Sequence, residues 1–197
     1  MPRARLVTTS FVAVTVATGA FFVYVGMLVP LLPRFIEDEL GAGELGVGLS
    51  VAAFALAAIL VRPLIARLIA AHGRRIVMFC GALTAGAAGL LCATVDSLPP
   101  LLALRGVAGI GEAALFVGAA TMIADMAPPD RRAEAASYFS VAIYGGLALG
   151  PAIGEAVLDG DRFHLAFVVA AACTVVAAVL ALAVPRRADA HAEADGV

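Results

Sequence analysis

Two charged side chains stand inside a long apolar stretch near the middle of the chain. The run from Leu101 to Ala124 is about as long as a helix needs to cross a bilayer, yet it contains Arg105 and Glu112. The two residues are seven positions apart, so on a helix they project from one face. A charge at mid-membrane costs about 2.5–3.5 kcal/mol on insertion scales, and it therefore indicates a functional site with a cavity or a partner beside it. The sequence predicts that this face lines a polar site.

Glu112 is the residue of this stretch best suited to carry a proton. It falls near mid-depth, about 10 Å along the helix axis from Arg105, which is too far for direct contact. A carboxyl group in such a place can bind and release a proton. We interpret Glu112 as the protonation site or as the group that meets a cationic substrate. The alternative is a neutral carboxyl group that is hydrogen-bonded to a neighbouring helix.

The composition indicates a membrane protein. Of 197 residues, 62% are hydrophobic and only 14% are charged, which is unusual for a soluble domain. A net charge of −2 without a basic patch argues against a nucleic-acid partner, and three cysteines inside apolar runs argue against disulfides and metal sites. The predicted fold is all-α, with a six-helix transmembrane bundle over residues 1–184 and a polar tail over 185–197. The predicted spans are 8–32, 45–66, 76–95, 101–124, 135–158 and 164–184.

The distribution of arginines predicts the orientation in the cell inner (plasma) membrane. Arginines gather before the first span, in the second and fourth joints and after the sixth span, all of which lie on one side if the chain crosses six times. By the positive-inside rule, both termini are cytoplasmic. A faint repeat relates 50–54 in the second span to 140–144 in the fifth. It is either chance similarity or the trace of two inverted three-helix units of the kind that builds many transporters.

Two local patterns lie at the predicted cytoplasmic ends. The joint ARLIAAHGRR contains Gly73, Arg74 and Arg75 in the arrangement Gly-Arg-Arg, and Asp125 ends the fourth span. This joint resembles the cytoplasmic signature of the major facilitator superfamily of transporters. The resemblance implies a charge network that latches the cytoplasmic gate, to which Asp125 would contribute through Arg74 or Arg75. The joint departs from the signature where alanines replace its Gly, Asp and Arg, at positions 66, 70 and 71.

Two further patterns carry the same resemblance. The fourth span holds Arg105-x-x-x-Gly109-x-Gly111, which is similar to the family signature associated with proton coupling. The fifth span resembles the antiporter signature in spacing, proline and flanking glycines. Glycines at every fourth position also form a smooth stripe for close helix packing, which is either simple packing or a seal against leaks. The residues of this antiporter motif are Gly146, Gly150, Pro151, Gly154 and Glu155.

Besides Arg105, three residues in the spans are candidates for a cavity: Glu155, Tyr24 and Tyr144. Arg105 and Glu155 lie at matching depths near the outer ends of antiparallel neighbours, so we expect a buried pair or a shared vestibule, unless both reach outward to the headgroups. Tyr24 and Tyr144 could line the same cavity or serve only in packing. Arg62 is expected to reach the cytoplasmic surface.

The resemblance covers nearly the whole chain and implies half of a transporter. It implies proton-coupled efflux of a small molecule by alternating access, with a second six-helix bundle supplied by a homodimer or a separate half. The alternative is a truncated or structural bundle that does not transport. No set of residues suited to catalysis, and none for a metal or a cofactor, is evident, so an enzyme is not expected.

Overall fold

The computed structural model describes residues 6–158 and 162–184, and the predicted tail at 185–197 lies outside them. In the described ranges the chain forms long helices joined by short turns. The helices are α1 (Thr9–Arg34), α2 (Gly43–His72), α3 (Arg74–Leu91), α4 (Leu98–Met126), α5 (Arg132–Leu158) and α6 (Phe163–Ala183), with a π-helix at Phe35–Glu39 and 3-10 turns at Cys92–Thr94 and Pro129–Arg131. Six of these segments are long and apolar enough to cross a membrane. The predicted all-α class with six spans is confirmed.

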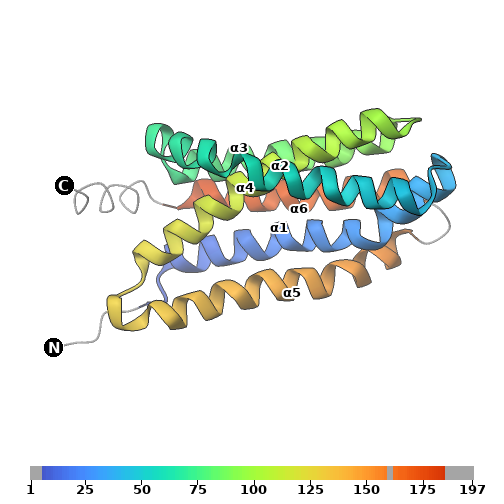
Figure 1. Ribbon diagram of the computed structural model, residues 1–197. Coiled ribbons are helices and arrows are strands. Elements are labelled where there is room, and N and C mark those ends of the chain that lie inside the picture. The colour runs from blue at the N-terminus through green and yellow to red at the C-terminus, as the bar shows by residue number, and fades with distance from the viewer. Residues whose placement is uncertain (1–5, 159–161, 185–197) are drawn as a thin grey trace.

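The helices pack in a pattern that repeats between the two halves of the chain. The central helix α1 packs against α5 and α6, while the other central helix, α4, packs against α2 and α3, and α3 meets α6. Exchanging α1–α3 with α4–α6 leaves this set of contacts unchanged, as expected for two three-helix units related by a pseudo-twofold axis. Figure 1 shows the long helices side by side, with the start of α1 and the end of α6 at the same end of the bundle.

The first helix runs further than predicted. Two prolines, Pro30 and Pro33, lie inside α1, which continues to Arg34 and into the π-helix, whereas the sequence suggested an end near Leu32. The extension is stabilised by packing, since the ring of Phe35 lies 5.6 Å from that of Phe163 in edge-to-face contact. Burial of this apolar turn outweighs the donors that the prolines remove.

Glycines set the spacing between α1 and α5. A Cβ placed on Gly150 would lie 2.5 Å from the Cα of Gly26, and one on Gly146 would lie 2.6 Å from the carbonyl oxygen of Gly19. Neither site has room for a side chain. The predicted glycine stripe therefore lies against the backbone of α1, and the expected close helix packing is confirmed.

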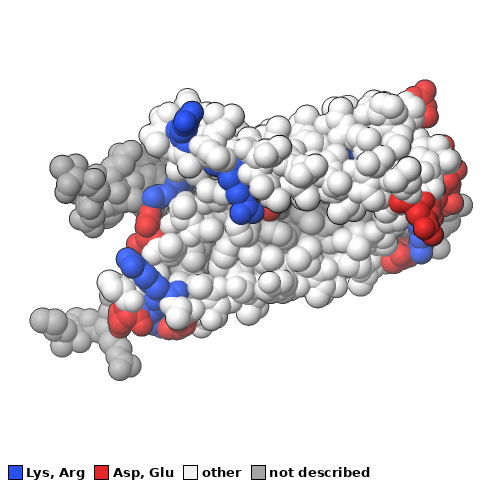
Figure 2. All heavy atoms as spheres, in the orientation of Figure 1, with Lys and Arg blue, Asp and Glu red and all other residues white. Residues whose placement is uncertain are grey.

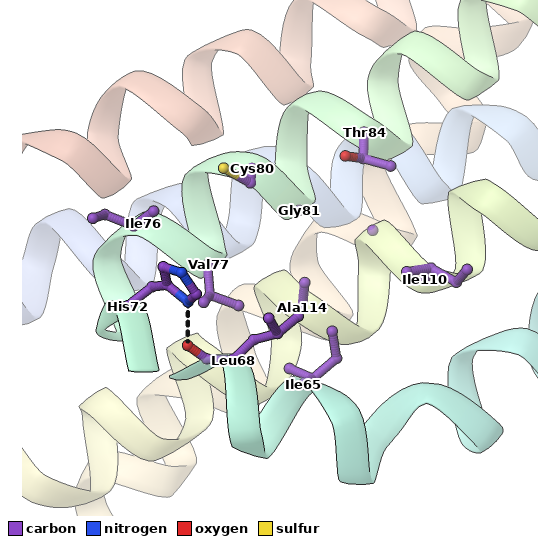
Figure 3. A pocket seen from close by; sticks show the side chains of 11 residues that line it. Ile65, Leu68, His72, Ile76, Val77, Cys80, Gly81, Thr84, Ile110 and Ala114 are labelled. Atoms are coloured by element: carbon purple, nitrogen blue, oxygen red, sulfur yellow. Dashed lines mark hydrogen bonds between the residues drawn. The ribbon is translucent and has the colours of Figure 1, made fainter. Parts of the chain in front are cut away.

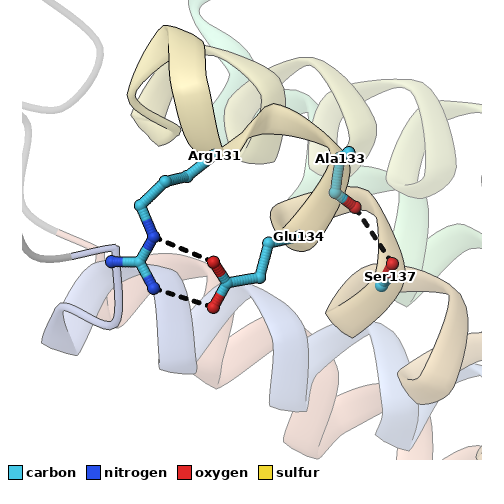
Figure 4. Close-up of polar contacts among 4 residues, drawn as sticks. All are labelled: Arg131, Ala133, Glu134 and Ser137. Carbon is cyan, nitrogen blue, oxygen red and sulfur yellow. Dashed lines mark hydrogen bonds and ion pairs between the residues drawn. The ribbon is translucent and has the colours of Figure 1, made fainter.

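The charged side chains gather at the two ends of the bundle, and its long side is almost free of them on the face in Figure 2. Where α5 begins, the guanidinium of Arg131 donates to both carboxylate oxygens of Glu134 at 2.8 and 2.7 Å, and Ser137 donates to the carbonyl of Ala133 (Figure 4). The turns α2–α3 and α4–α5 lie at one end, which we call the Arg-rich end. It carries Arg67, Arg74, Arg75, Arg131 and Arg132.

Candidate functional site

One aromatic ring joins four helices near the middle of the bundle. The ring of Phe116, in α4, lies 6.3 Å from that of Phe22 in α1 and 5.8 Å from that of Phe139 in α5. The guanidinium carbon of Arg62, in α2, lies 5.8 Å from the centre of the same ring. Glu112 is one helical turn before Phe116, so the two side chains share a face of α4. We call these five residues the central cluster.

Charge and apolar surface meet within the central cluster. Glu112 is partly buried, Arg62 is exposed, and the charge of Arg62 acts on the Glu112 carboxyl group. Phe22 and Phe139 are buried and pack on the ring of Phe116. A carboxylate beside an aromatic face attracts organic cations, because the carboxylate carries a negative charge and the face of the ring has a negative electrostatic potential. The structure thus gives Glu112 a charged neighbour from α2, Arg62, next to a ring of its own helix, Phe116, that packs on α1 and α5.

Arg62 does not follow the expectation from sequence. We expected its side chain to extend to the cytoplasmic surface, but the guanidinium lies over Phe116 instead. Sequence reasoning also overlooked Phe22, Phe116 and Phe139. The available signal was the spacing of Phe116 four positions after Glu112, whereas the other two rings belong to α1 and α5 and only the fold brings them together.

Arg105 lies apart from this cluster, inside the bundle. Its side chain is buried, and its guanidinium carbon lies 4.5 Å from the centre of the Phe54 ring of α2. Tyr24 and Cys92 are near enough to interact with its charge. Its Nε has no hydrogen-bond partner within the described part of the chain. The six-helix unit therefore shields Arg105 by itself.

The expected pair between Arg105 and Glu155 is wrong. Glu155 forms an ion pair of 3.0 Å with Arg34, at the end of α1, and both side chains are about half exposed. The close packing of α1 on α5 places these two residues at the same end of neighbouring helices. Arg105 and Glu155 were predicted to pair because they lie at matching depths in α4 and α5. These two helices make few contacts with each other, whereas α1 and α5 pack along their length.

The two tyrosines proposed for a common cavity lie in different surroundings. Tyr24 is buried, and its hydroxyl donates a hydrogen bond of 2.8 Å to the carbonyl oxygen of Ala85 in α3. A Cβ on Gly89 would lie 2.5 Å from that hydroxyl, so this glycine makes room for the ring. Tyr144 is 70% exposed on α5. The structure does not bring the tyrosines together.

The glycines after Arg105 hold α4 against two neighbours. A Cβ on Gly109 would collide with the carbonyl oxygen of Phe54 in α2, and one on Gly111 would lie 2.5 Å from the carbonyl oxygen of Gly81 in α3. Their spacing of two places them on different sides of the helix. The pattern Arg-x-x-x-Gly-x-Gly thus combines a buried cation with the close packing that encloses it.

The α2–α3 turn carries an ion pair. Gly73 has φ +81°, a conformation that favours glycine, and this reverses the chain between the two helices. The next residue, Arg74, forms an ion pair of 2.5 Å with Asp125 at the end of α4. Asp125 was expected to contact Arg74 or Arg75, and the structure selects Arg74. The alanines at positions 66, 70 and 71 leave this contact intact.

A separate apolar groove of about 310 Å³ lies between α2, α3 and α4. Figure 3 shows Ile65, Val77 and Ala114 along it, with His72 near one end, where its Nδ1 lies 3.3 Å from the carbonyl oxygen of Leu68. Among the described residues that line this groove there is no Arg, Asp or Glu. It therefore differs in chemistry from the central cluster, and Gly111 is the residue of the predicted motifs that contributes to it.

The sequence is similar to a family of membrane proteins and to two bacterial resistance proteins. The sequence model of the Major Facilitator Superfamily matches residues 12–196. The chain is 30% identical over 172 residues to multidrug resistance protein 1 of Bacillus subtilis, covering 87% of this chain and 44% of that protein. It is 27% identical over 161 residues to the quinolone resistance protein NorA of Staphylococcus aureus, covering 82% of this chain and 41% of NorA.

Solved structures agree on the fold. The human organic anion transporter MFSD10 superposes with a TM-score of 0.77 at 20% identity, over 90% of this chain and 47% of that one. The peptide transporter POT superposes with a TM-score of 0.70 at 22% identity, over 91% of this chain and 38% of the transporter. The chain spans less than half the length of these relatives. With its six span-length helices, its internal pseudo-symmetry and a family match over nearly its whole length, this chain belongs to the major facilitator superfamily of membrane transporters.

Proposed function

We propose that this chain forms one six-helix half of a proton-coupled exporter of small organic molecules. The observation that carries the proposal is the central cluster, in which Glu112 and Arg62 lie beside the ring of Phe116 at a depth where charges are costly. Glu112 binds a proton in one state of the cycle and attracts a cationic substrate in another. The partly exposed ring of Phe116 supplies apolar contact, and the buried rings of Phe22 and Phe139 hold it in position.

The relatives support the direction of transport and the kind of substrate. One is named for multidrug resistance and another for quinolone resistance, which points to export of varied small molecules. The antiporter-like motif in α5 agrees, because Gly146, Gly150 and Gly154 bring the backbone of α5 against α1, and a contact this close can seal one side of a pathway. The proposed activity is transport, without an enzymatic step.

The exposed faces of α2 and α5 support the need for a second bundle. Only 17% of the apolar stretch of α2 and 22% of that of α5 are buried, against 56% for α4. Large apolar side chains such as Leu60, Val141 and Tyr144 are 76%, 69% and 70% exposed there. In an alternating-access cycle, a second six-helix bundle covers these faces and rocks about the central cluster.

We place the Arg-rich end in the cytoplasm. The arginines of the α2–α3 and α4–α5 turns follow the positive-inside rule, which makes the start of α1 and the end of α6 cytoplasmic as well. The ion pair of Arg74 with Asp125 then serves as the cytoplasmic latch. Labelling of a cysteine introduced at Arg67 in intact cells and in inverted vesicles tests this orientation.

Transport itself is tested in proteoliposomes that contain the purified full-length protein. We expect an imposed proton gradient to drive movement of ethidium, a fluorescent organic cation, and an uncoupler to stop it. Movement no faster than in protein-free liposomes, from a folded and monodisperse preparation, would refute export of this kind. That result favours the alternative of a structural bundle that does not transport.

The second bundle is tested by cross-linking. In a variant whose native cysteines are replaced, Tyr144→Cys on α5 should form an oxidative cross-link to a bundle that packs on this face. Val179→Cys on α6, which is 59% exposed on a different helix, is the matched control and should remain unlinked. Equal cross-linking at both positions contradicts a specific interface.

A further inference from the structure

Arg62 is an arginine in the apolar belt without a carboxylate partner in direct contact. It lies 11 residues before the Gly73 turn, or about 16 Å along α2 from the Arg-rich end. Arg34, Arg74 and Arg131 each form an ion pair, whereas no carboxylate in the described ranges lies within 4.0 Å of Arg62. Its side chain is exposed. Its guanidinium is therefore held weakly.

Two features keep the guanidinium in its position. The first is the face of the Phe116 ring, at 5.8 Å, which is near the outer limit for a cation–π contact. The second is the attraction of Glu112, which acts without a direct hydrogen bond. Both features act on positive charge in general rather than on arginine in particular, and an external organic cation would be attracted to the same place.

We propose that Arg62 is a built-in competitor of the transported cation, which must move off Phe116 before a substrate can stack there. This inference rests on the proposed function and adds a residue that sets its specificity. Arg62 lowers the affinity for cations, so that only a cation with enough apolar surface to cover the partly exposed ring of Phe116 displaces it. Small hydrated cations lack that surface and do not displace the guanidinium.

Equilibrium binding of tetraphenylphosphonium to the full-length protein in detergent tests the proposal. Arg62→Gln removes the competing charge and should tighten binding at least about threefold, which corresponds to the weak end of cation–π contacts. Arg62→Lys keeps the charge and should bind much as the unaltered protein does. Arg67→Gln, an exposed arginine of the same helix outside the cluster, is the matched control and should change nothing.

A neutral probe separates competition from a change of shape. Triphenylphosphine oxide has three of the same rings without the charge, so its binding should not respond to Arg62→Gln. Unchanged or weaker tetraphenylphosphonium binding by Arg62→Gln overturns the proposal, and so does an equal gain for both probes. Proton-driven ethidium transport in proteoliposomes is measured independently, so the proposed exporter function can stand when the competitor role fails. Circular dichroism verifies that each variant is folded.

Discussion

The guanidinium of Arg34 lies 3.0 Å from the carboxylate of Glu155, joining the last turns of two helices that glycines hold in close contact. Both side chains are about half exposed, so the pair is screened and contributes little. We expect Glu155→Gln to lower the free energy of unfolding by less than about 1 kcal/mol. The charge swap Arg34→Glu with Glu155→Arg should restore it, as followed by circular dichroism in detergent. A larger loss, or rescue by pairing Glu155→Arg with Arg105→Glu instead, contradicts this assignment.

The pair of Arg74 with Asp125 should matter more. Arg74 is largely buried on the α2–α3 turn, and its Nε has no hydrogen-bond partner in the part of the chain that the structure describes. Asp125→Asn removes the carboxylate that pairs with Arg74. It should lower the free energy of unfolding by about 1–2 kcal/mol, between the values for exposed and buried ion pairs. Arg75→Gln is the control on the next residue and should cost less. Equal thermal stability of Asp125→Asn and the unaltered protein would argue against the latch.

Tyr24 and Tyr144 should separate into a structural residue and a surface residue. Tyr24→Phe removes the hydrogen bond to the carbonyl oxygen of Ala85 and should cost about 0.5–1.5 kcal/mol, because that bond is buried. Tyr144→Phe removes a hydroxyl from an exposed ring and should leave the unfolding midpoint unchanged. The comparison uses the same chemical change at both sites. Equal losses at both positions would mean that a second bundle buries Tyr144 in the purified protein.

Neighbouring glycines of α5 offer a matched test of close packing. Gly150→Ala places a methyl group 2.5 Å from the Cα of Gly26 and should destabilise the protein by about 1–3 kcal/mol. A Cβ on Gly145 meets nothing within 4 Å, so Gly145→Ala should be neutral or stabilise the helix by up to about 1 kcal/mol. Thermal unfolding of both variants measures the difference. Similar midpoints would indicate that α1 and α5 can separate without loss.

The long apolar runs were sufficient to predict the six helices, since a bilayer-spanning stretch leaves little choice of backbone structure. The glycine stripe also predicted a close helix neighbour. It did not predict which one, because a smooth face fits any partner and only the fold selects α1. The position of Arg105 in an apolar run predicted a polar site on that face of α4, but not that Arg105 would be buried against Phe54.

The central cluster was only half predictable from the sequence. Glu112 stands out because a carboxyl group in an apolar run is costly, whereas Phe22 and Phe139 resemble any other core aromatic residue. Their role depends on the pseudo-symmetric packing that brings α1 and α5 to one side of α4. The prediction that Arg62 reaches the cytoplasmic surface was wrong because the predicted span ended at residue 66. The helix α2 continues to His72, which places Arg62 well inside it.

Glu112 provides the decisive test of proton coupling. Glu112→Gln keeps the size and the hydrogen-bonding capacity of the side chain but removes the ionisable proton, so ethidium transport should no longer respond to an imposed proton gradient. Downhill movement of ethidium should persist at a reduced rate, because the rings of the central cluster remain. Glu44→Gln, at the exposed start of α2, is the control, because it makes the same chemical change outside the central cluster and should leave the gradient response in place. Transport by Glu112→Gln with full dependence on the proton gradient would assign coupling to another residue.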